Sequence, residues 1–390
     1  MTIRNDGDRL QQVRAWRRAL HQCPETAFAE HAASDLVAGV LDDLGFAVTR
    51  NIGGTGLVGT LTRGRDPRGI ALRADMDGLP IREVADHDYA SRTEGRMHAC
   101  GHDGHMAMVL GAAATLAVDG GFEGTVHVVF QPAEEPGQGA QAMIDDGLFD
   151  RFRIDAMYGL HNLPGLPAGH LHTRAGAIMA SEDNFTIDIT GRGGHAARPE
   201  MVIDPIVIGA EIVLALQTIA SRTVDPLSPV VVSCTNFVTD GARNAIPGAV
   251  RITGDTRSFD PAVQATIERR IRQAAENIAA AHGATATVTY THEFAPTIND
   301  ARCAAQVHAS ATVALGADNV TTPCPPIMGS EDFGVFANHV PACFAFIGNG
   351  SVGTPGGTPL HSGGYDFNDE VLPAGIAFYS QLVRDVLAEP

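Results

Sequence analysis

Apolar residues recur at helical spacing near the start of the chain and in short continuous runs farther along it. In residues 8–20 and 34–44 they return every three or four positions, which predicts two amphipathic helices, the second with Ser34 as a candidate N-cap. An alanine-rich stretch at residues 106–118 predicts a buried helix. Strands that alternate with helices favour an α/β layer with functional residues at the strand ends. Strands are predicted at residues 57–64, 69–75, 125–132 and 154–162, of which 69–75 and 125–132 are expected to be buried.

The pattern changes after Ala175 and changes back after Pro296. Between them the order is strand, helix, strand, strand, helix, strand, which is typical of a ferredoxin-like α+β sandwich. The sequence therefore predicts a catalytic domain of residues 1–178 and 296–390, interrupted by a smaller domain of residues 179–295. The inserted elements are expected at residues 184–191, 204–220, 230–238, 250–259, 261–281 and 284–293, and the returning strand and helix at 343–350 and 371–387.

The composition excludes several kinds of function. The 390 residues carry a formal net charge of −18, which opposes binding to nucleic acid or to an anionic membrane. All 27 cationic side chains are arginine, so a Schiff-base lysine and a P-loop lysine are both excluded. The N-terminal sequence lacks the apolar core of a secretory signal, and no apolar run approaches the roughly 18 residues of a membrane span. The six cysteines are scattered, so we expect reduced thiols and a cytoplasmic location.

Metal-capable side chains are densest between His98 and His105, where Cys100 and His102 also lie. A borderline metal such as zinc accepts this mixture of thiolate and imidazole. Any one of these histidines, taken alone, also fits an ordinary surface or core position. The cluster supplies too few fixed ligands by itself, so a metal site needs donors from elsewhere in the chain. Candidate donors stand at the ends of predicted strands and in a late loop, namely Glu134, Glu135, His161 and His361.

Glu134 and Glu135 follow directly after a predicted buried strand. Two desolvated carboxylates push one another toward protonation unless each has a partner, and a metal ion would supply one. One carboxylate can then bind the ion while its neighbour acts as a general base on water. The alternative is a solvated loop, because acidic side chains are usually exposed.

Eight runs of sequence, in order, resemble the aminoacylase and hippurate-hydrolase branch of the glutamate-carboxypeptidase-like metallopeptidases. The resemblance covers nearly the full chain, from about Arg14 to the final helix. It implies a zinc-exopeptidase-like α/β catalytic domain, with a central mixed sheet flanked by helices, interrupted by a ferredoxin-like α+β lid domain that dimerises. The runs are ALRADMDGLP, HACGHDGH, FQPAEEPGQGA, YGLHN, GRGGHAARP, NAIPGAVRITGDTRSF, MGSEDFGVF and LHSGGYDFND.

The resemblance also implies which residues bind two divalent ions in each subunit. Glu134 would be the catalytic base, and Cys100 would bridge the ions. Manganese or zinc is the favoured metal, and cobalt and nickel are compatible with the same donors. The implied ligands are Cys100, His102, Glu135, His161 and His361.

The chain departs from the wider family at two positions. Where many relatives have His-x-Asp, this chain has Asp75-Met76-Asp77, and Cys100 stands where many have a bridging aspartate. The resemblance then implies that His102 replaces the missing histidine and that Asp77 orients a metal-bound imidazole through its other ring nitrogen. By resemblance, this pattern fits the aminoacylase branch and not the broad peptidase branch.

In the predicted lid domain, the resemblance makes His195 a residue that reaches the partner subunit's active site and stabilises an oxyanion. It makes Asn244 and Arg257 the residues that hold a substrate carboxylate. Without the resemblance, Asn244 could open a turn and Arg257 could be an ordinary surface residue. Glu331 fits a helix cap as well as a site residue, and His98 and His105 have no role in the family pattern.

The resemblance therefore implies a homodimer, with larger assemblies open, that hydrolyses the amide bond of N-acyl amino acids such as N-acetyl or N-benzoyl derivatives. The products would be a carboxylic acid and a free amino acid. A first alternative is a dipeptidase or carboxypeptidase of the same fold. A second is a non-catalytic relative that binds a metal or ligand, which Glu134 disfavours because a binding site needs no carboxylate beside a ligand carboxylate.

Overall fold

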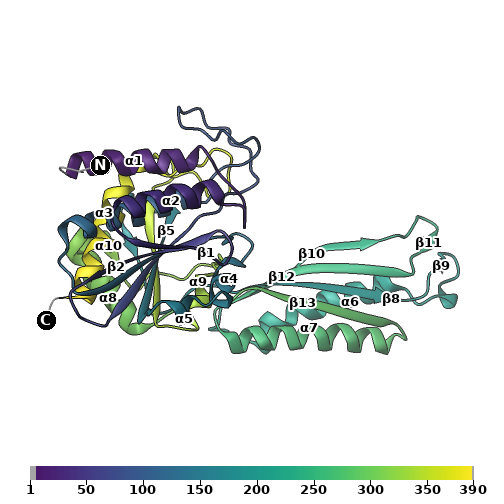
Figure 1. The fold of residues 1–390 in the computed structure, drawn as a ribbon. Helices are drawn as coiled ribbons and strands as arrows, with labels where there is room; N and C mark the ends of the chain where they lie inside the picture. Colours follow the sequence, from purple (N-terminus) through teal and green to yellow (C-terminus); the bar gives the residue numbers. More distant parts are fainter. Residues whose placement is uncertain (1–5, 389–390) are drawn as a thin grey trace. The chain divides into compact units, whose positions relative to one another are not determined.

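The computed structural model describes residues 6–388 and divides them into two compact units (Figure 1). The larger unit comprises the chain up to Ile178, Ile298–Pro325 and the chain from Asp332 onward. The smaller unit comprises Met179–Thr297 and Pro326–Glu331. The sequence assigns residues 326–331 to the catalytic domain, whereas in the structure their backbone bonds to the start of the smaller unit, at Ala180.

The larger unit is built on one mixed sheet of eight strands. Its middle strands β4, β3, β5 and β16 run parallel to one another, β1 and β2 pair antiparallel with their neighbours, and β6 pairs antiparallel with β16 and parallel with β15. All side chains of β3 and β16 are buried, as in parallel sheets covered on both faces. The sheet order is β1 (Ala47–Ile52), β2 (Gly56–Arg63), β4 (Gly124–Gln131), β3 (Gly69–Asp75), β5 (Ala156–Pro164), β16 (Ala342–Gly350), β6 (Leu171–His172) and β15 (Val320–Thr321).

Two groups of helices cover this sheet, which confirms the predicted fold class (Figure 1). The first group packs around the buried helix α3 and includes α1, α2, α8 and α10, whereas α4, α5 and α9 form a second group that contacts β4, β5 and β16. The helices are α1 (Asp6–His21), α2 (His31–Asp43), α3 (His102–Asp119), α4 (Gly139–Asp145), α5 (Leu148–Arg151), α8 (Ala301–Leu315), α9 (Phe333–Ala337) and α10 (Leu372–Val386). Short elements are η3 (Ala317–Asn319), η4 (Asp369–Val371), β7 (Gly176–Met179) and β14 (Thr297–Asn299).

The start of α2 corrects one expectation from the sequence. Ser34 was a candidate N-cap, but the helix begins at His31, and Ser34 is a buried residue of its first turns. Glu30 occupies the cap position, and its carboxylate accepts hydrogen bonds from the backbone of Phe28 and Ala133 instead. The prediction failed because the helix starts three residues earlier, at His31, so Ser34 lies within the helix as a buried residue instead of capping it.

The smaller unit has the predicted β-α-β-β-α-β order and a four-stranded antiparallel sheet with β10 at one edge. Side chains alternate between buried and exposed along β12, because both helices pack on one face of the sheet. Strands β9 and β11 form a two-stranded ribbon at one end of the smaller unit (Figure 1). The elements are β8 (Glu182–Thr190), β9 (Gly194–His195), η1 (Pro199–Met201), α6 (Pro205–Thr218), η2 (Ile219–Thr223), β10 (Val230–Thr239), β11 (Ala245–Ile246), β12 (Ala249–Ser258), α7 (Pro261–Ala281) and β13 (Thr285–Phe294).

One helical segment of the smaller unit, Pro205–Thr223, has the length and mean hydropathy of a membrane span, 19 residues at 1.4. Glu211, Gln217 and Arg222 interrupt its apolar residues, so the segment is not a continuous apolar run. Ile208, Ile212 and other residues of this segment pack in the core of the smaller unit. The segment is thus the core helix of a folded domain, with one apolar face left exposed.

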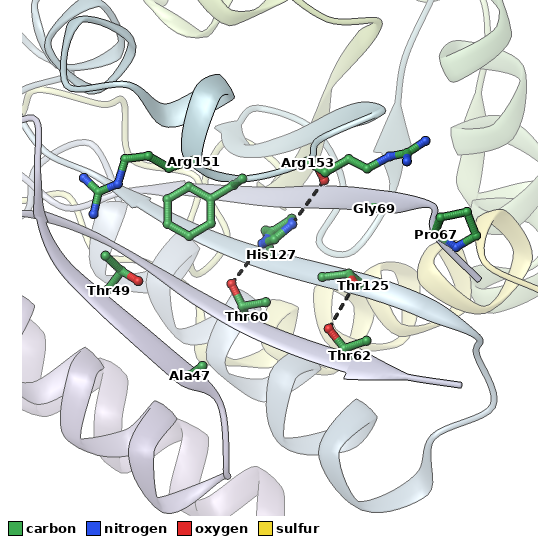
Figure 2. Close-up of a pocket in the computed structure, with 11 residues that line it drawn as sticks. Ala47, Thr49, Thr60, Thr62, Pro67, Gly69, Thr125, His127, Arg151 and Arg153 are labelled. Carbon is green, nitrogen blue, oxygen red and sulfur yellow. Dashed lines mark hydrogen bonds between the residues drawn. The ribbon is translucent and has the colours of Figure 1, made fainter. Parts of the chain in front are cut away.

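A hollow of about 420 Å³ lies over β1, β2 and β4 (Figure 2). Threonine side chains line it, together with His127, Arg151 and Arg153. Thr60 donates to His127 Nδ1 over 3.0 Å, and His127 Nε2 donates to the carbonyl of Arg153 over 3.1 Å. Since both ring nitrogens are used, His127 offers no free base, and this hollow contains none of the predicted site residues.

Candidate metal centre

The parallel strands β3, β4 and β5 bring distant parts of the sequence to one edge of the larger sheet. Asp75 is the last residue of β3, Glu134 and Glu135 follow β4, and His161 lies near the end of β5. Parallel strands present their carboxyl ends at the same edge, where α/β proteins usually carry their sites. The sheet topology thus explains why residues so far apart in sequence meet.

Helix α3 supplies the other part of the centre, because His102 is its first residue and Cys100 stands just before it. Gly101 has a φ of 92°, a left-handed conformation that favours glycine. A Cβ atom at this position would collide with the side chains of Asn162 and Tyr365. Glycine is therefore required for Cys100 and His102 to face the strand ends together.

The structure brings the five predicted ligands and the predicted base Glu134 into one cluster. Cys100 Sγ lies 3.4 Å from His161 Nε2, and His361 Nε2 lies 3.5 Å from Glu135 Oε2. His102 Nε2 lies 3.9 Å from a carboxylate oxygen of both Glu134 and Glu135. Two overlapping sets of donors result, each with atoms within 4.8 Å of one another: Cys100, Glu135 and His361, and His102, Glu134 and Glu135.

Buried atoms at the centre of the cluster fit metal ions. The side chain of His102 is fully buried, yet its Nε2 has no hydrogen-bond partner among residues 6–388. The Oε1 atom of Glu135 is likewise buried and without a hydrogen bond in the described chain. Leaving such polar atoms unpaired costs about 1–3 kcal/mol each, whereas a cation between them would satisfy both. The mixture of thiolate, imidazole and carboxylate suits zinc or manganese.

The pKa values of these groups reflect the crowding of acids. Burial lowers the pKa of His102, but Asp75, Asp77 and Glu135 outweigh it and raise the value to about 10. Burial, with further contributions from Asp77 and Asp75, raises the pKa of Glu135 to about 7 although His102 opposes this shift. A bound cation would replace the proton that such a site otherwise attracts.

Asp77 supports the cluster through contacts with the backbone of Glu134 and Glu135 and with the ring of His102. Its two carboxylate oxygens accept hydrogen bonds from the backbone N–H groups of Glu134, over 3.1 Å, and Glu135, over 3.0 Å. Its Oδ1 atom also lies 3.3 Å from Nδ1 of His102. A carboxylate on the far nitrogen of a metal-binding imidazole is the usual way in which proteins orient such a ligand.

Some supporting residues were not found from the sequence. His105 Nδ1 donates to Asp75 over 2.6 Å, and its Nε2 accepts from the backbone N–H of Asn162 over 3.0 Å. Asn162 Nδ2 donates to the carbonyl of Cys100 over 2.7 Å, and Tyr365 donates to Asn162 Oδ1 over 2.6 Å. His105 therefore has a structural role, and Asn162 fixes the backbone of Cys100. The only sequence signal for Asn162 was its place directly after His161.

The remaining predicted residues, His195, Asn244 and Arg257, belong to the smaller unit. His195 and Asn244 are neighbours in the β9–β11 ribbon, where Ala196 N donates to Asn244 O over 3.1 Å, and both side chains are exposed. Arg257 on β12 contacts Glu182 at 2.9 Å and Asp255 at 3.0 Å. Glu331 is also buried in the smaller unit.

Residues 71–385 match the family model of peptidase family M20/M25/M40. The chain belongs to this family. It is 37% identical over 371 residues, with 95% of both chains covered, to a hippurate hydrolase of Campylobacter jejuni. It is 33% identical to thermostable carboxypeptidase 2 of Saccharolobus solfataricus, with 97% of both chains covered.

A solved structure supports the assignment to the M20 family. The Bacillus subtilis YxeP protein, described as a dinuclear metal-binding peptidase of family M20, matches with a TM-score of 0.85 and 29% identity. The match covers 98% of this chain and 99% of that chain. Together with the clustered donors, the family assignment makes this M20 protein a metal-dependent hydrolase of amides.

Proposed function

We propose that this M20 family member is an amidohydrolase that binds two divalent metal ions and converts an N-acyl amino acid into a carboxylic acid and an amino acid. The observation that carries the proposal is the pairing of Glu134 with Glu135 beside the unpaired ring nitrogen of His102. The likeness to a hippurate hydrolase over 95% of both chains supports the class of substrate. All six cysteines are free thiols, which supports a cytoplasmic location.

Cys100, His102, Glu135, His161 and His361 would hold the ions. Bound divalent ions acidify water and polarise carbonyl groups. Manganese and zinc are the metals that we favour for this donor set, with cobalt and nickel also compatible.

Glu134 would act as the general base and then as the general acid. Its carboxylate lies next to the ligand set, and the backbone bond to Asp77 fixes its position. Glu134 would take a proton from the attacking water as that water adds to the amide carbonyl, and would pass it to the departing nitrogen. The second proton transfer is required because an amine leaves only when protonated.

His195 would stabilise the negative charge that grows on the carbonyl oxygen. Its Nδ1 accepts a hydrogen bond from the backbone N–H of Ala197 over 3.0 Å, which places the ring proton on the exposed Nε2. A neutral imidazole with a free Nε2–H is a suitable oxyanion donor. We propose that it serves the active site of a partner subunit.

Asn244 and Arg257 would bind the substrate carboxylate. Asn244 is exposed beside His195, so both can approach one ligand. The Nε and Nη1 groups of Arg257 already contact Asp255 and Glu182, which leaves Nη2 without a partner in residues 6–388. Arg257 would therefore give the substrate a single hydrogen bond and a positive charge rather than a two-pronged grip.

A second copy of this chain is the proposed partner of the smaller unit. Helix α6 and the edge strand β10 expose Val207, Leu214 and Val238, with exposed fractions of 57%, 71% and 51%. An unpaired strand edge beside an apolar helix face is a surface that proteins usually cover. A homodimer through this surface would cover both, and larger assemblies would need further contacts.

The proposed function is tested with metal-loaded protein and a panel of N-acetyl and N-benzoyl amino acids. Wild type should release free amino acid. The Glu134→Gln variant should turn over about 10²- to 10⁴-fold more slowly while it retains both ions. Metal analysis of both proteins checks that retention. Wild-type activity in Glu134→Gln, or no turnover of any acylated amino acid by wild type, would overturn the proposal.

A carboxypeptidase is the second candidate, and the 33% identity to thermostable carboxypeptidase 2 favours it. Peptides and acylated amino acids share the amide and the free carboxylate, so the same residues would serve either reaction. The same assay with dipeptides and N-blocked dipeptides separates the two. A kcat/KM for peptides above that for acylated amino acids would favour the carboxypeptidase.

A further inference from the structure

We propose that the larger unit has a further metal site, separate from the catalytic pair, in which His21, Glu83 and His87 bind a zinc-like divalent cation. His21 ends α1, whereas Glu83 and His87 lie in the long connection between β3 and α3. None of the three belongs to the donor set of the catalytic centre.

The donor atoms of the proposed site lie close to one another. Glu83 Oε1 lies 3.1 Å from His21 Nε2 and 2.8 Å from His87 Nε2. Ligands at about 2.0–2.1 Å from a tetrahedral zinc ion are roughly 3.3 Å apart. Asp366 offers a fourth oxygen, because donor atoms of His21, His87 and Asp366 all lie within 4.8 Å of one another.

His87 Nε2 is the donor that hydrogen bonding does not explain. The atom is buried and close to Glu83, yet it makes no hydrogen bond within residues 6–388, because its orientation relative to the carboxylate is unsuitable. Its ring stacks on Tyr89 with 4.1 Å between centroids, which holds it in this orientation. A cation between His87 and Glu83 would satisfy both donors at once.

His21 is arranged as a metal ligand. Its Nδ1 bonds to the buried carboxylate of Asp103 over 2.8 Å, and its Nε2 bonds to Glu83 Oε1 over 3.1 Å. This is the carboxylate–imidazole arrangement that orients metal-binding histidines, and it repeats the relation of Asp77 to His102 at the catalytic centre.

The local charge also favours a divalent cation. Arg17 is fully buried and contacts the carboxylates of Asp103, Asp366 and Asp369 at 2.5–3.3 Å. Arg18 pairs with Asp369 as well. Two arginines therefore face three aspartates and Glu83, which leaves a formal charge of −2 when the histidines are neutral. One divalent ion would neutralise it.

Such an ion would join the connection between β3 and α3 to the end of α1. Residues 76–101 contain no helix or strand and carry Asp77 and Cys100 of the catalytic centre. Long connections of this kind are ordered at a cost in entropy, which a metal that joins them to α1 would offset. The further site is thus structural and holds the approach to Cys100 in place.

The test counts zinc ions in the complete protein. After saturation with zinc chloride and gel filtration, wild type should hold about one zinc ion per chain more than the His87→Gln variant. His308→Gln, at an exposed position on α8, is the matched control and should bind as much zinc as wild type. Added zinc should also raise the melting temperature of His87→Gln less than that of wild type.

A second measurement does not depend on any variant. Crystals of zinc-saturated wild type should give anomalous density at the zinc edge between His21 and His87, in addition to the density at the catalytic pair. Equal zinc content in wild type and His87→Gln, or no anomalous density at this position, would overturn the proposal. The catalytic ions serve as an internal standard in both measurements, so loss of the further site alone leaves the proposed function unaffected.

Discussion

At the scale of single residues, Asp77 shows how one carboxylate fixes several parts of the metal centre. It binds the backbone of Glu134 and Glu135 and lies beside the ring of His102. In Asp77→Asn, the amide would still accept one backbone bond but would present an NH₂ group to the other donor or to the imidazole. We expect metal affinity or kcat/KM to fall about 10- to 100-fold with little change in fold.

Metal titration and circular dichroism of Asp77→Asn check this expectation. Asp66→Asn is a suitable control, since Asp66 pairs with Arg68 on the surface of the same unit. Unchanged metal affinity and unchanged kcat/KM in Asp77→Asn would show that Asp77 does not orient the centre.

His127 makes the larger unit sensitive to acid. Burial lowers its pKa to about 4, from a value near 6.5 in the unfolded chain. At pH values between about 4 and 6.5 the unfolded chain binds more protons than the folded chain. The free energy of unfolding therefore falls as the pH drops below about 6.5, and the loss that His127 causes is complete below about pH 4. At pH 5 the loss is about 2 kcal/mol. The melting temperature of His127→Gln should therefore fall less between pH 7 and pH 5 than that of wild type.

The exposed His308 provides the comparison, because His308→Gln should keep the wild-type pH dependence. Parallel curves for wild type and His127→Gln would exclude His127 as the source of the acid sensitivity.

The sequence identified the candidate ligands and Asp77, but not the other residues that hold the ligands in place. Thiol, imidazole and carboxylate groups stand out in a sequence because few chemistries require them together. Asn162, Tyr365 and Glu30 have no such signal, since neutral side chains and single acids occur throughout the chain. The bonds of Asn162 to Cys100, of Tyr365 to Asn162 and of Glu30 to Ala133 depend on how distant segments pack, which the sequence pattern alone does not specify.

At the scale of secondary structure, Arg73 joins several elements inside the larger unit. Its guanidinium contacts Asp75 at 2.7 Å, Gln131 of β4 at 2.8 Å and Asp332, just before α9, at 3.2 Å. Asp332 in turn accepts from the backbone N–H of Ala140 in α4 over 2.9 Å. Arg73→Met would remove the buried arginine that pairs with Asp75 and Asp332, and loss of one partner of a buried ion pair typically costs about 3–5 kcal/mol.

Chemical denaturation measures this cost as a lower midpoint for the larger unit. Arg50→Met on β1 removes an exposed pair with Asp35 and should cost no more than about 1 kcal/mol. Similar midpoints for the two variants would contradict a central role for Arg73.

Elements with strong periodic patterns were predicted closely, whereas those defined by tertiary contacts were not. The helix expected at residues 261–281 is α7, Pro261–Ala281, because proline and the Asp260 cap mark its start. Helix α3 begins at His102, before the alanine-rich stretch that predicted it, because its first turn consists of polar site residues. Helix α8 was not predicted, since alanines and small polar residues there give only a weak apolar stripe.

At the scale of the whole molecule, the proposed homodimer predicts that each active site combines residues of two chains. Glu134 belongs to the larger unit and His195 to the smaller one. If His195 serves the partner subunit, a mixed dimer of Glu134→Gln and His195→Ala has one site with neither defect. Refolding or coexpressing the two inactive variants together should restore up to about a quarter of wild-type activity, because half the dimers are mixed and each has one intact site.

The matched control combines Glu134→Gln with His361→Ala, two changes within the larger unit. Neither site of that mixed dimer is intact, so it should stay inactive. Leu214→Asp, which puts a charge on the exposed face of α6, should give monomers in light scattering and remove the complementation. If the first mixture is no more active than its components while wild type is a dimer, His195 acts within its own chain, and the shared-site arrangement is wrong.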